Sequence, residues 1–229
     1  MSIQVKYSRN NKLSDLICSN YDLLLILSRF GIALGFGDQT VGEVCEKHKV
    51  DTDTFLAVVN FMENNYYPED YYENNLSIET LVAFLQQAHA YFLNYNLPEI
   101  RKKLVDAIGN ANNEISFLIL KFYDEYVDEV QRHMEYENDV VFKYVASLLE
   151  GNRPHGYSIS VFEDRHNHIA EKLGDLKNII IKYYPSDTNN NNINNVLFDI
   201  FNCEKDLDIH CSVEDYIFVP LIKQFEEKK

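Results

Sequence analysis

Residues 132–142 read RHMEYENDVVF, and this stretch decides the architecture of the chain. His133 and Glu137 follow Tyr126 and Val130, and precede Val140, at intervals of three and four residues. That spacing is typical of the face that an amphipathic helix buries. A carboxylate on such a face is costly unless a positive group pairs with it. The stretch therefore predicts a buried helix whose glutamate has a partner elsewhere in the chain.

The composition excludes several classes of protein. With 229 residues, 46% of them hydrophobic, the chain is long enough to bury a substantial core, so global disorder is not expected. The formal net charge of -15 argues against nucleic-acid binding, because phosphate contacts need clustered Lys and Arg. The charge balance otherwise predicts only a protein that repels anionic surfaces.

The sequence also predicts a cytoplasmic protein without a membrane span. No apolar run approaches the roughly 20 residues that a spanning helix requires. The N-terminal residues MSIQVKYSRNNKLSDL lack the apolar core of a secretory signal. The four cysteines form no CxxC pair and are expected to be reduced thiols, with Cys203 packed in the core.

Sparse glycine and proline favour an all-α fold with two domains. Residues 1–68 are expected to form a small helical N-terminal domain, followed by a polar linker around Pro68. Within this domain we expect one helix over residues 14–30 and another that Asp51 or Asp53 caps. Residues 69–229 then carry four long amphipathic segments with short polar connections, one of them the asparagine tract SDTNNNNINN, at 77–108, 113–149, 158–184 and 193–226. This pattern predicts an up-down-up-down four-helix bundle.

Each of the four segments places one histidine on its apolar stripe. The second and fourth segments add a glutamate one turn later, so the stripes bring six polar residues toward one interior: His89, His133, Glu137, His166, His210 and Glu214. The remaining histidines, His48, His155 and His168, fall off the stripes. The stripe thus selects His166 over His168.

Two interpretations of this pattern compete. A single histidine on an apolar face is usually a hydrogen-bonded core residue, and one His-x-x-x-Glu pair often only supports a helix surface. Two buried carboxylates without Lys or Arg on the facing stripes would be strongly destabilising, and a metal cation removes that cost. Nitrogen and oxygen donors without thiolate, rich in imidazole, favour a di-iron centre over zinc or manganese. We expect Glu137 and Glu214 to bridge two ions, with the four histidines as terminal ligands.

The sequence resembles the hemerythrin-like (HHE cation-binding) family, and within it the di-iron proteins that repair iron–sulfur clusters. The resemblance rests on HMEYENDVVF and HCSVEDYIFVP, on HAYFLNYNLPEI and RHNHIAEKL around His89 and His166, and on GIALGFGDQTVGEVCEKHKVDTDTF in the N-terminal domain. Where those repair proteins have a Cys-Cys-Gly-Gly turn, this chain reads Leu34-Gly35-Phe36-Gly37.

The resemblance implies a hemerythrin-like bundle with two non-haem iron ions that acts under nitrosative or oxidative stress. It implies NO, O2 or reactive oxygen species as small ligands, redox chemistry or iron donation as the activity, and iron–sulfur proteins as partners. Whether such a centre makes the protein an enzyme stays open. The alternatives are an O2, NO or redox sensor, or an iron-binding module without catalysis, which the missing cysteine pair favours, and a metal-free helical scaffold.

Overall fold

A computed structural model describes residues 6–64, 76–108, 114–153, 156–163, 171–184 and 190–228. Within these ranges the chain is all-α: it has no β-strand, and Lys12 and Thr40 form an isolated antiparallel bridge. The all-α prediction is confirmed. Contacts divide the chain into two compact units, one of Met1–Ala88 with Ser212–Lys229 and one of His89–Cys211. The predicted division at residue 68 stays a prediction, since its linker lies outside the described residues.

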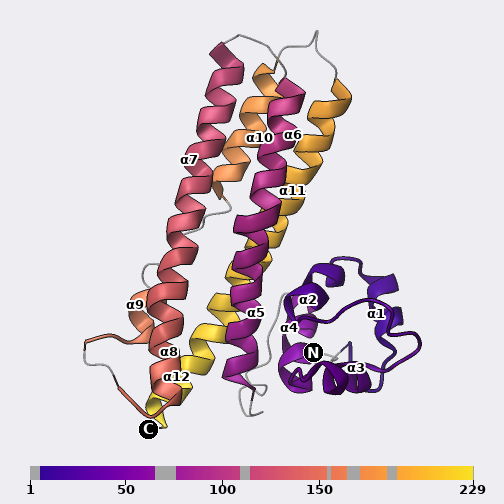
Figure 1. Ribbon diagram of the computed structural model, residues 1–229, viewed down its shortest axis with the longest axis vertical. Coiled ribbons are helices and arrows are strands. Elements are labelled where there is room, and N and C mark those ends of the chain that lie inside the picture. Colours follow the sequence, from indigo (N-terminus) through magenta and orange to yellow (C-terminus); the bar gives the residue numbers. More distant parts are fainter. Residues whose placement is uncertain are drawn as a thin grey trace. The chain divides into compact units, whose positions relative to one another are not determined.

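Long helices that run side by side build the unit His89–Cys211 (Figure 1). In chain order they are α5 (Ile78–Tyr91, whose last residues belong here), η2 (Phe92–Asn96), α6 (Leu97–Ile108), α7 (Glu114–Tyr136), η3 (Glu137–Val141), α8 (Phe142–Leu149), α9 (Ile159–Glu163), α10 (Glu171–Tyr183) and α11 (Asn190–Val213). The elements η2 and η3, and η4 (Glu214–Phe218) in the other unit, are single π-helical turns, and they continue the α-helices before and after them without a break.

Ion pairs connect each of the four bundle helices to the next. Arg101 on α6 binds Asp124 on α7 with both its Nε and Nη2, at 2.7 and 3.0 Å. Lys172 on α10 pairs with Glu129 on α7, and Lys177 on α10 pairs with Glu204 on α11. The ring closes from α11 back to α6, where Asp199 accepts a hydrogen bond of 2.8 Å from Lys103. Such surface pairs add little stability, but they match the neighbours of an up-down-up-down bundle.

The asparagine tract departs from its predicted loop structure. Helix α11 begins at Asn190, so the tract contributes its last residues to the first turns of the helix. Ile193 and Val196 on those turns are buried in the bundle. Their burial explains the difference, because tertiary packing of an apolar face outweighs the weak helix propensity of asparagine.

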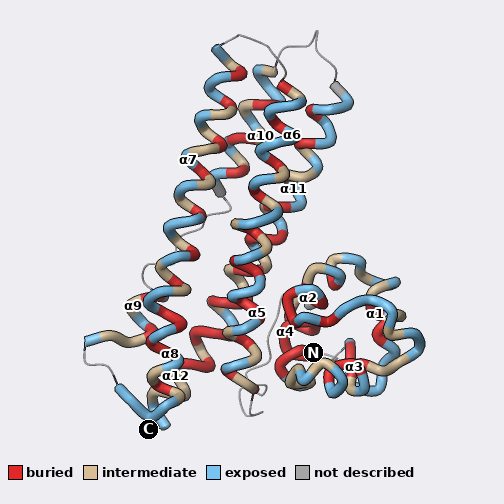
Figure 2. Tube along the Cα trace, in the orientation of Figure 1, coloured by how far each residue is buried: buried red, intermediate tan, exposed pale blue. Residues whose placement is uncertain are grey.

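The other unit is built around α4 (Thr52–Asn64), which is buried along most of its length (Figure 2). It also contains α1 (Leu13–Ser19), α2 (Leu23–Arg29), α3 (Val41–His48), most of α5, η4 (Glu214–Phe218) and α12 (Val219–Glu227). The aromatic ring of Phe30 stacks on Phe84 at 4.6 Å and meets the edge of Phe55 at 5.2 Å.

The helix predicted over residues 14–30 is wrong, since the structure divides it into α1 and α2. Asn20 takes an extended backbone conformation after α1, and its side-chain oxygen accepts a hydrogen bond of 3.1 Å from the backbone N–H of Asp22. This local Asx turn offers the backbone an alternative to continued helix. The cap of α4 is Asp51, whose carboxylate accepts from the backbone N–H of Thr54 at 2.8 Å, as one of the two predicted alternatives requires.

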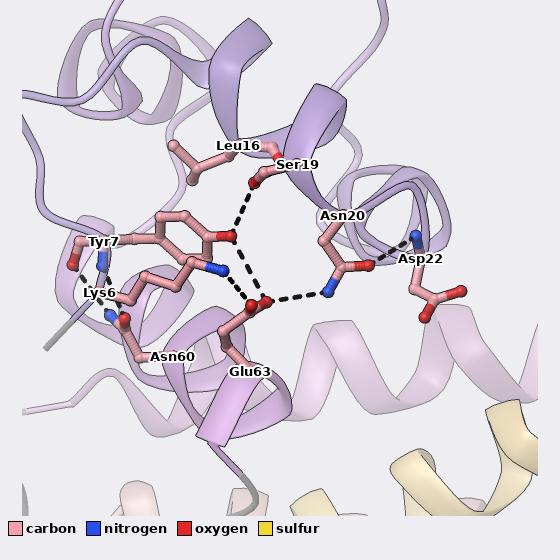
Figure 3. A network of polar contacts seen from close by, with 8 residues as sticks. All are labelled: Lys6, Tyr7, Leu16, Ser19, Asn20, Asp22, Asn60 and Glu63. Carbon is pink, nitrogen blue, oxygen red and sulfur yellow. Dashed lines mark hydrogen bonds and ion pairs between the residues drawn. The ribbon is translucent and has the colours of Figure 1, made fainter. Parts of the chain in front are cut away.

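A polar network ties the start of the described chain to the end of α4 (Figure 3). The side chain of Asn60 pairs with the backbone of Tyr7 through two hydrogen bonds of 2.9 and 3.0 Å. One turn later the carboxylate of Glu63 binds Lys6 and accepts a hydrogen bond of 3.0 Å from Asn20. These contacts join segments that are more than 40 residues apart in the sequence.

Candidate metal centre

Four polar side chains gather in the interior of the helical fold. His89 lies in the last turn of α5, Glu137 begins η3, His210 lies near the end of α11 and Glu214 begins η4. One donor atom from each lies within 4.8 Å of a donor atom from every other. All four are buried, with exposed fractions of 1% for the histidines and 0% for the glutamates. The cluster is therefore a group of nitrogen and oxygen donors held away from water.

The carboxylate of Glu137 faces two different imidazoles. Its Oε2 lies 3.1 Å from Nε2 of His89, and its Oε1 lies 2.7 Å from Nε2 of His133. His133 is on α7, one turn before Glu137, and is 15% exposed. The carboxylate thus has one oxygen directed at each ring.

His89 is held at both of its ring nitrogens. Its Nε2 also lies 3.1 Å from Nε2 of His210, so two imidazole nitrogens and one carboxylate oxygen meet at one place. Its Nδ1 lies 3.1 Å from the side-chain oxygen of Asn138. The ring stacks on Phe142 at 5.5 Å, while Phe92 meets the ring of His210 at 5.9 Å. Aromatic rings therefore line the cluster and lower its local dielectric.

The donors fit a cation. Neighbouring donor atoms around a metal with bonds of about 2.1 Å lie roughly 3 to 3.4 Å apart in octahedral or tetrahedral geometry. Both separations of 3.1 Å at His89 fall in this range, and the 2.7 Å between Nε2 of His133 and Oε1 of Glu137 is slightly shorter. Two fully buried carboxylates also need positive charge nearby to offset their loss of hydration. The cluster therefore has the chemistry of a metal-binding site.

Each π-turn in the described chain lies beside a member of the cluster. η3 begins at Glu137, η4 begins at Glu214, and η2 begins three residues after His89. A π-turn adds one residue to the helical repeat and is frequent at functional sites. The extra residue corrects the predicted stripe, because Val140 is 38% exposed whereas Val141 is fully buried.

The structure brings together four of the six residues that the sequence stripes selected: His89, Glu137, His210 and Glu214. His133 contacts this group through Glu137. His166 lies outside the described residues, as do His155 and His168. Sequence reasoning missed Asn138, which is off the apolar stripe. In the sequence, Asn138 is distinguished only by its position directly after Glu137. A polar residue next to a glutamate is too common to identify a site residue.

One comparison with known proteins identifies a family for this chain, and another finds no match. No curated protein matches the sequence significantly. None of the helices in the described part of the chain is long and apolar enough to cross a membrane. Residues 80–222 match the family described as "Hemerythrin HHE cation binding domain", and this range contains the whole His/Glu cluster. Because the match spans more than half of the sequence, the chain belongs to the hemerythrin family of HHE cation-binding domains.

Proposed function

We propose that the cluster binds two iron ions as a carboxylate-bridged, non-haem centre. The proposed ligands are the six residues that the stripes selected: His89, His133, Glu137, His166, His210 and Glu214. One observation carries the proposal: the two oxygens of Glu137 face two different imidazoles, at 3.1 and 2.7 Å. A carboxylate that bridges two ions presents its oxygens in this way, and a helical bundle can supply such motifs from facing helices.

The choice of iron rests on the kinds of donor. The cluster contains imidazole nitrogens and carboxylate oxygens, and none of its four members is a cysteine. Thiolate-rich sites select zinc or copper(I), and carboxylate-rich sites suit manganese and magnesium. The proposed set of six ligands, with four imidazoles and two carboxylates, suits iron.

The proposed activity is that of the iron–sulfur-repair branch of the family, in nitrosative or oxidative stress. An iron centre supplies binding and redox chemistry for a small ligand such as NO, O2 or a reactive oxygen species, or is itself a store of iron for donation to iron–sulfur proteins. The chain's own residues hold the donors in place, and Glu137 and Glu214 balance positive charge. Phe92 and Phe142 pack beside the histidines and keep bulk water away.

A second candidate is an O2, NO or redox sensor, or an iron-binding module without catalysis. The turn between α2 and α3 favours it, because Leu34 and Gly35 stand where the repair proteins have two cysteines. Leu34 is 68% exposed there, and Gly35 and Gly37 on either side of Phe36 have positive φ angles. A turn without thiols has no redox chemistry of its own, so contacts of its apolar side chains would transmit the signal.

The test is the metal content of protein made in iron-replete cells, followed by anaerobic addition of NO. We expect about two irons per chain and a change in the visible spectrum with NO. Glu137→Ala should lose most of the iron, because it removes the carboxylate that faces both imidazoles. Glu135→Ala is the matched control, since Glu135 is exposed at the end of α7 and accepts a hydrogen bond from Gln131 on the surface. Well under one iron per chain in the wild type would contradict the proposal.

Binding of NO alone does not distinguish the two candidates. Repeated turnover of NO or peroxide with an added electron donor favours the repair-type activity. A partner protein that binds only one oxidation state favours the sensor. Equal binding of that partner to reduced, oxidised and metal-free protein excludes the sensor.

A further inference from the structure

We infer that Asn138 is a positioning residue of the metal centre, which orients His89 as a ligand. The side-chain oxygen of Asn138 lies 3.1 Å from Nδ1 of His89, and this contact joins residues 49 positions apart in the sequence. In the proposed arrangement Nδ1–H donates a hydrogen bond to Asn138, so the lone pair on Nε2 is directed into the cluster. The inference rests on the proposed metal function and adds to it a residue that does not touch the metal.

One run of residues holds the ring of His89 from three sides. Glu137 faces its Nε2 at 3.1 Å, Asn138 faces its Nδ1 at 3.1 Å, and Phe142 stacks on its plane at 5.5 Å with an interplanar angle of 21°. All three come from residues 137–142, and the ring itself is 1% exposed. The orientation of His89 is therefore set by η3 and the start of α8.

The chemistry of imidazole ligation explains why an acceptor is needed at Nδ1. A neutral imidazole that binds a metal through Nε2 must carry its proton on Nδ1. An acceptor for that proton fixes the tautomer and the ring orientation, and raises the basicity of the ligating nitrogen. An amide oxygen does this without adding charge, and the cluster already contains two buried carboxylates, Glu137 and Glu214.

The π-turn explains how two consecutive residues reach one ring. Successive side chains on an α-helix diverge by about 100°, so neighbours normally face different directions. A π-turn closes with i→i+5 hydrogen bonds and holds more residues per turn, so its successive side chains diverge less. Glu137 and Asn138 are the first two residues of η3, and both contact His89.

The first test compares iron(II) affinities, measured anaerobically by competition with a chelator. Asn138→Leu removes the acceptor at similar size and should weaken iron(II) binding by about 10- to 100-fold. Asn138→Asp keeps an acceptor and should bind within a few-fold of the wild type or more tightly. Asp139→Leu is the matched control, since the exposed Asp139 pairs with Lys143 on the surface. Equal affinities of the wild type and Asn138→Leu would overturn the inference.

The second test observes the proton itself, first in the wild type and then in the two Asn138 variants. In zinc(II)-loaded protein, which is diamagnetic, we expect NMR to show the Nδ1–H of His89 as a signal protected from solvent exchange. The signal should remain in Asn138→Asp and exchange rapidly in Asn138→Leu while circular dichroism is unchanged. A wild-type His89 that carries its proton on Nε2, or no protected proton, would overturn the inference. Failure of the wild type to bind iron(II) or zinc(II) would overturn the proposed function as well, so the two failures are distinguishable.

Discussion

Two buried tyrosines on α7 differ in what their hydroxyl groups contact. The hydroxyl of Tyr123 donates a hydrogen bond of 2.8 Å to the backbone carbonyl of Leu97, the first residue of α6 after its π-turn. The hydroxyl of Tyr126 has no hydrogen-bond partner among the described residues, although this side chain is only 2% exposed. Burial raises the pKa of both hydroxyls, so both stay protonated. Comparison of the two tyrosines therefore shows how much a hydrogen-bonded buried hydroxyl stabilises the fold, and how much a buried hydroxyl without a partner among the described residues costs.

Replacement of each tyrosine by phenylalanine should therefore have opposite effects. Tyr123→Phe removes the donor to Leu97 and is expected to lower the free energy of unfolding by about 1–2 kcal/mol. Tyr126→Phe removes a hydroxyl that has no hydrogen-bond partner among the described residues, and it should leave stability within about 0.5 kcal/mol of the wild type, or raise it. Urea unfolding of the metal-free proteins measures both. A larger loss for Tyr126→Phe than for Tyr123→Phe would mean that its hydroxyl binds an ordered water or a residue outside the described ranges.

Individual residues of the site differ in whether the sequence alone could identify them. His89, Glu137, His210 and Glu214 were identifiable because helical periodicity places a polar residue in an apolar stripe, and such residues require a reason. Asn138 was not identifiable, because its role depends on a contact with a residue 49 positions away. No local pattern encodes that distance. The apolar stripe of a helix also does not predict whether Glu137, Asn138 or both contact the ring of His89.

At the scale of the element, the π-turn η3 sets the register between Glu137 and the rest of its helix. The buried residues after Glu137 are Val141, Phe142, Tyr144, Val145 and Leu148, at offsets of 4, 5, 7, 8 and 11. A regular α-helix face would include offsets of 3 and 4 in the first turn, whereas here offset 3, Val140, is exposed and offsets 4 and 5 are buried. One extra residue in the π-turn accounts for this shift of the first turn.

Deletion of Asp139 should consequently convert η3 to α-helix without loss of the bundle. It moves Val141, Phe142 and Val145 to the α-helical offsets of 3, 4 and 7, so we expect a cooperative unfolding transition and unchanged helix content. Iron(II) affinity should fall, because Glu137 and Asn138 no longer reach His89 together. Deletion of the exposed Asp128, within regular α7, is the control. It turns Tyr123 and Tyr126 by about 100° relative to the cluster and should abolish cooperative unfolding.

Circular dichroism and thermal unfolding distinguish these outcomes. If the Asp139 deletion unfolds the protein as severely as the Asp128 deletion does, the π-turn is required for folding and not only for the site.

The π-turn is also the part of this helix that the sequence did not predict. The four helical segments were predicted nearly to their ends because their apolar stripes are long. A π-turn changes the stripe by one residue and has no composition of its own, so the prediction placed Val140 in the core.

At the scale of the whole molecule, a fall in pH has two opposite effects on stability: it relieves the repulsion among the surface carboxylates, and it weakens the polar network around Glu63. The formal net charge is -15, so protonation of surface carboxylates relieves repulsion and favours the compact state. Partial burial acts to raise the pKa of Glu63, but hydrogen bonds from Lys6 and Asn20 outweigh it and leave that pKa below its ordinary value of 4.5. The same contact with Glu63 raises the pKa of Lys6.

The sign of the Glu63 effect follows from linkage. A carboxyl whose pKa is lower in the folded state stabilises the fold fully above its unfolded pKa, and this stabilisation is lost as the pH falls through the folded pKa. Glu63→Gln should therefore cost about 1 kcal/mol at pH 7, a small value because solvent screens the exposed Lys6. The difference between wild type and variant should begin to shrink as the pH drops below about 4.5, and it should be lost below the folded pKa of Glu63, where both side chains are neutral.

Urea unfolding at a series of pH values, with metal removed, measures this difference directly. Glu46→Gln is the matched control, because Glu46 is exposed on α3 and its substitution removes the same charge from the whole molecule. If both variants change stability equally at pH 7, relief of general repulsion dominates and the network contributes nothing. If the Glu63 difference persists unchanged at pH 3, its contribution comes from hydrogen bonds that do not need the charge. Loss of the difference on acidification, for Glu63 alone, would show that an ionised carboxylate joins the first described residues to α4.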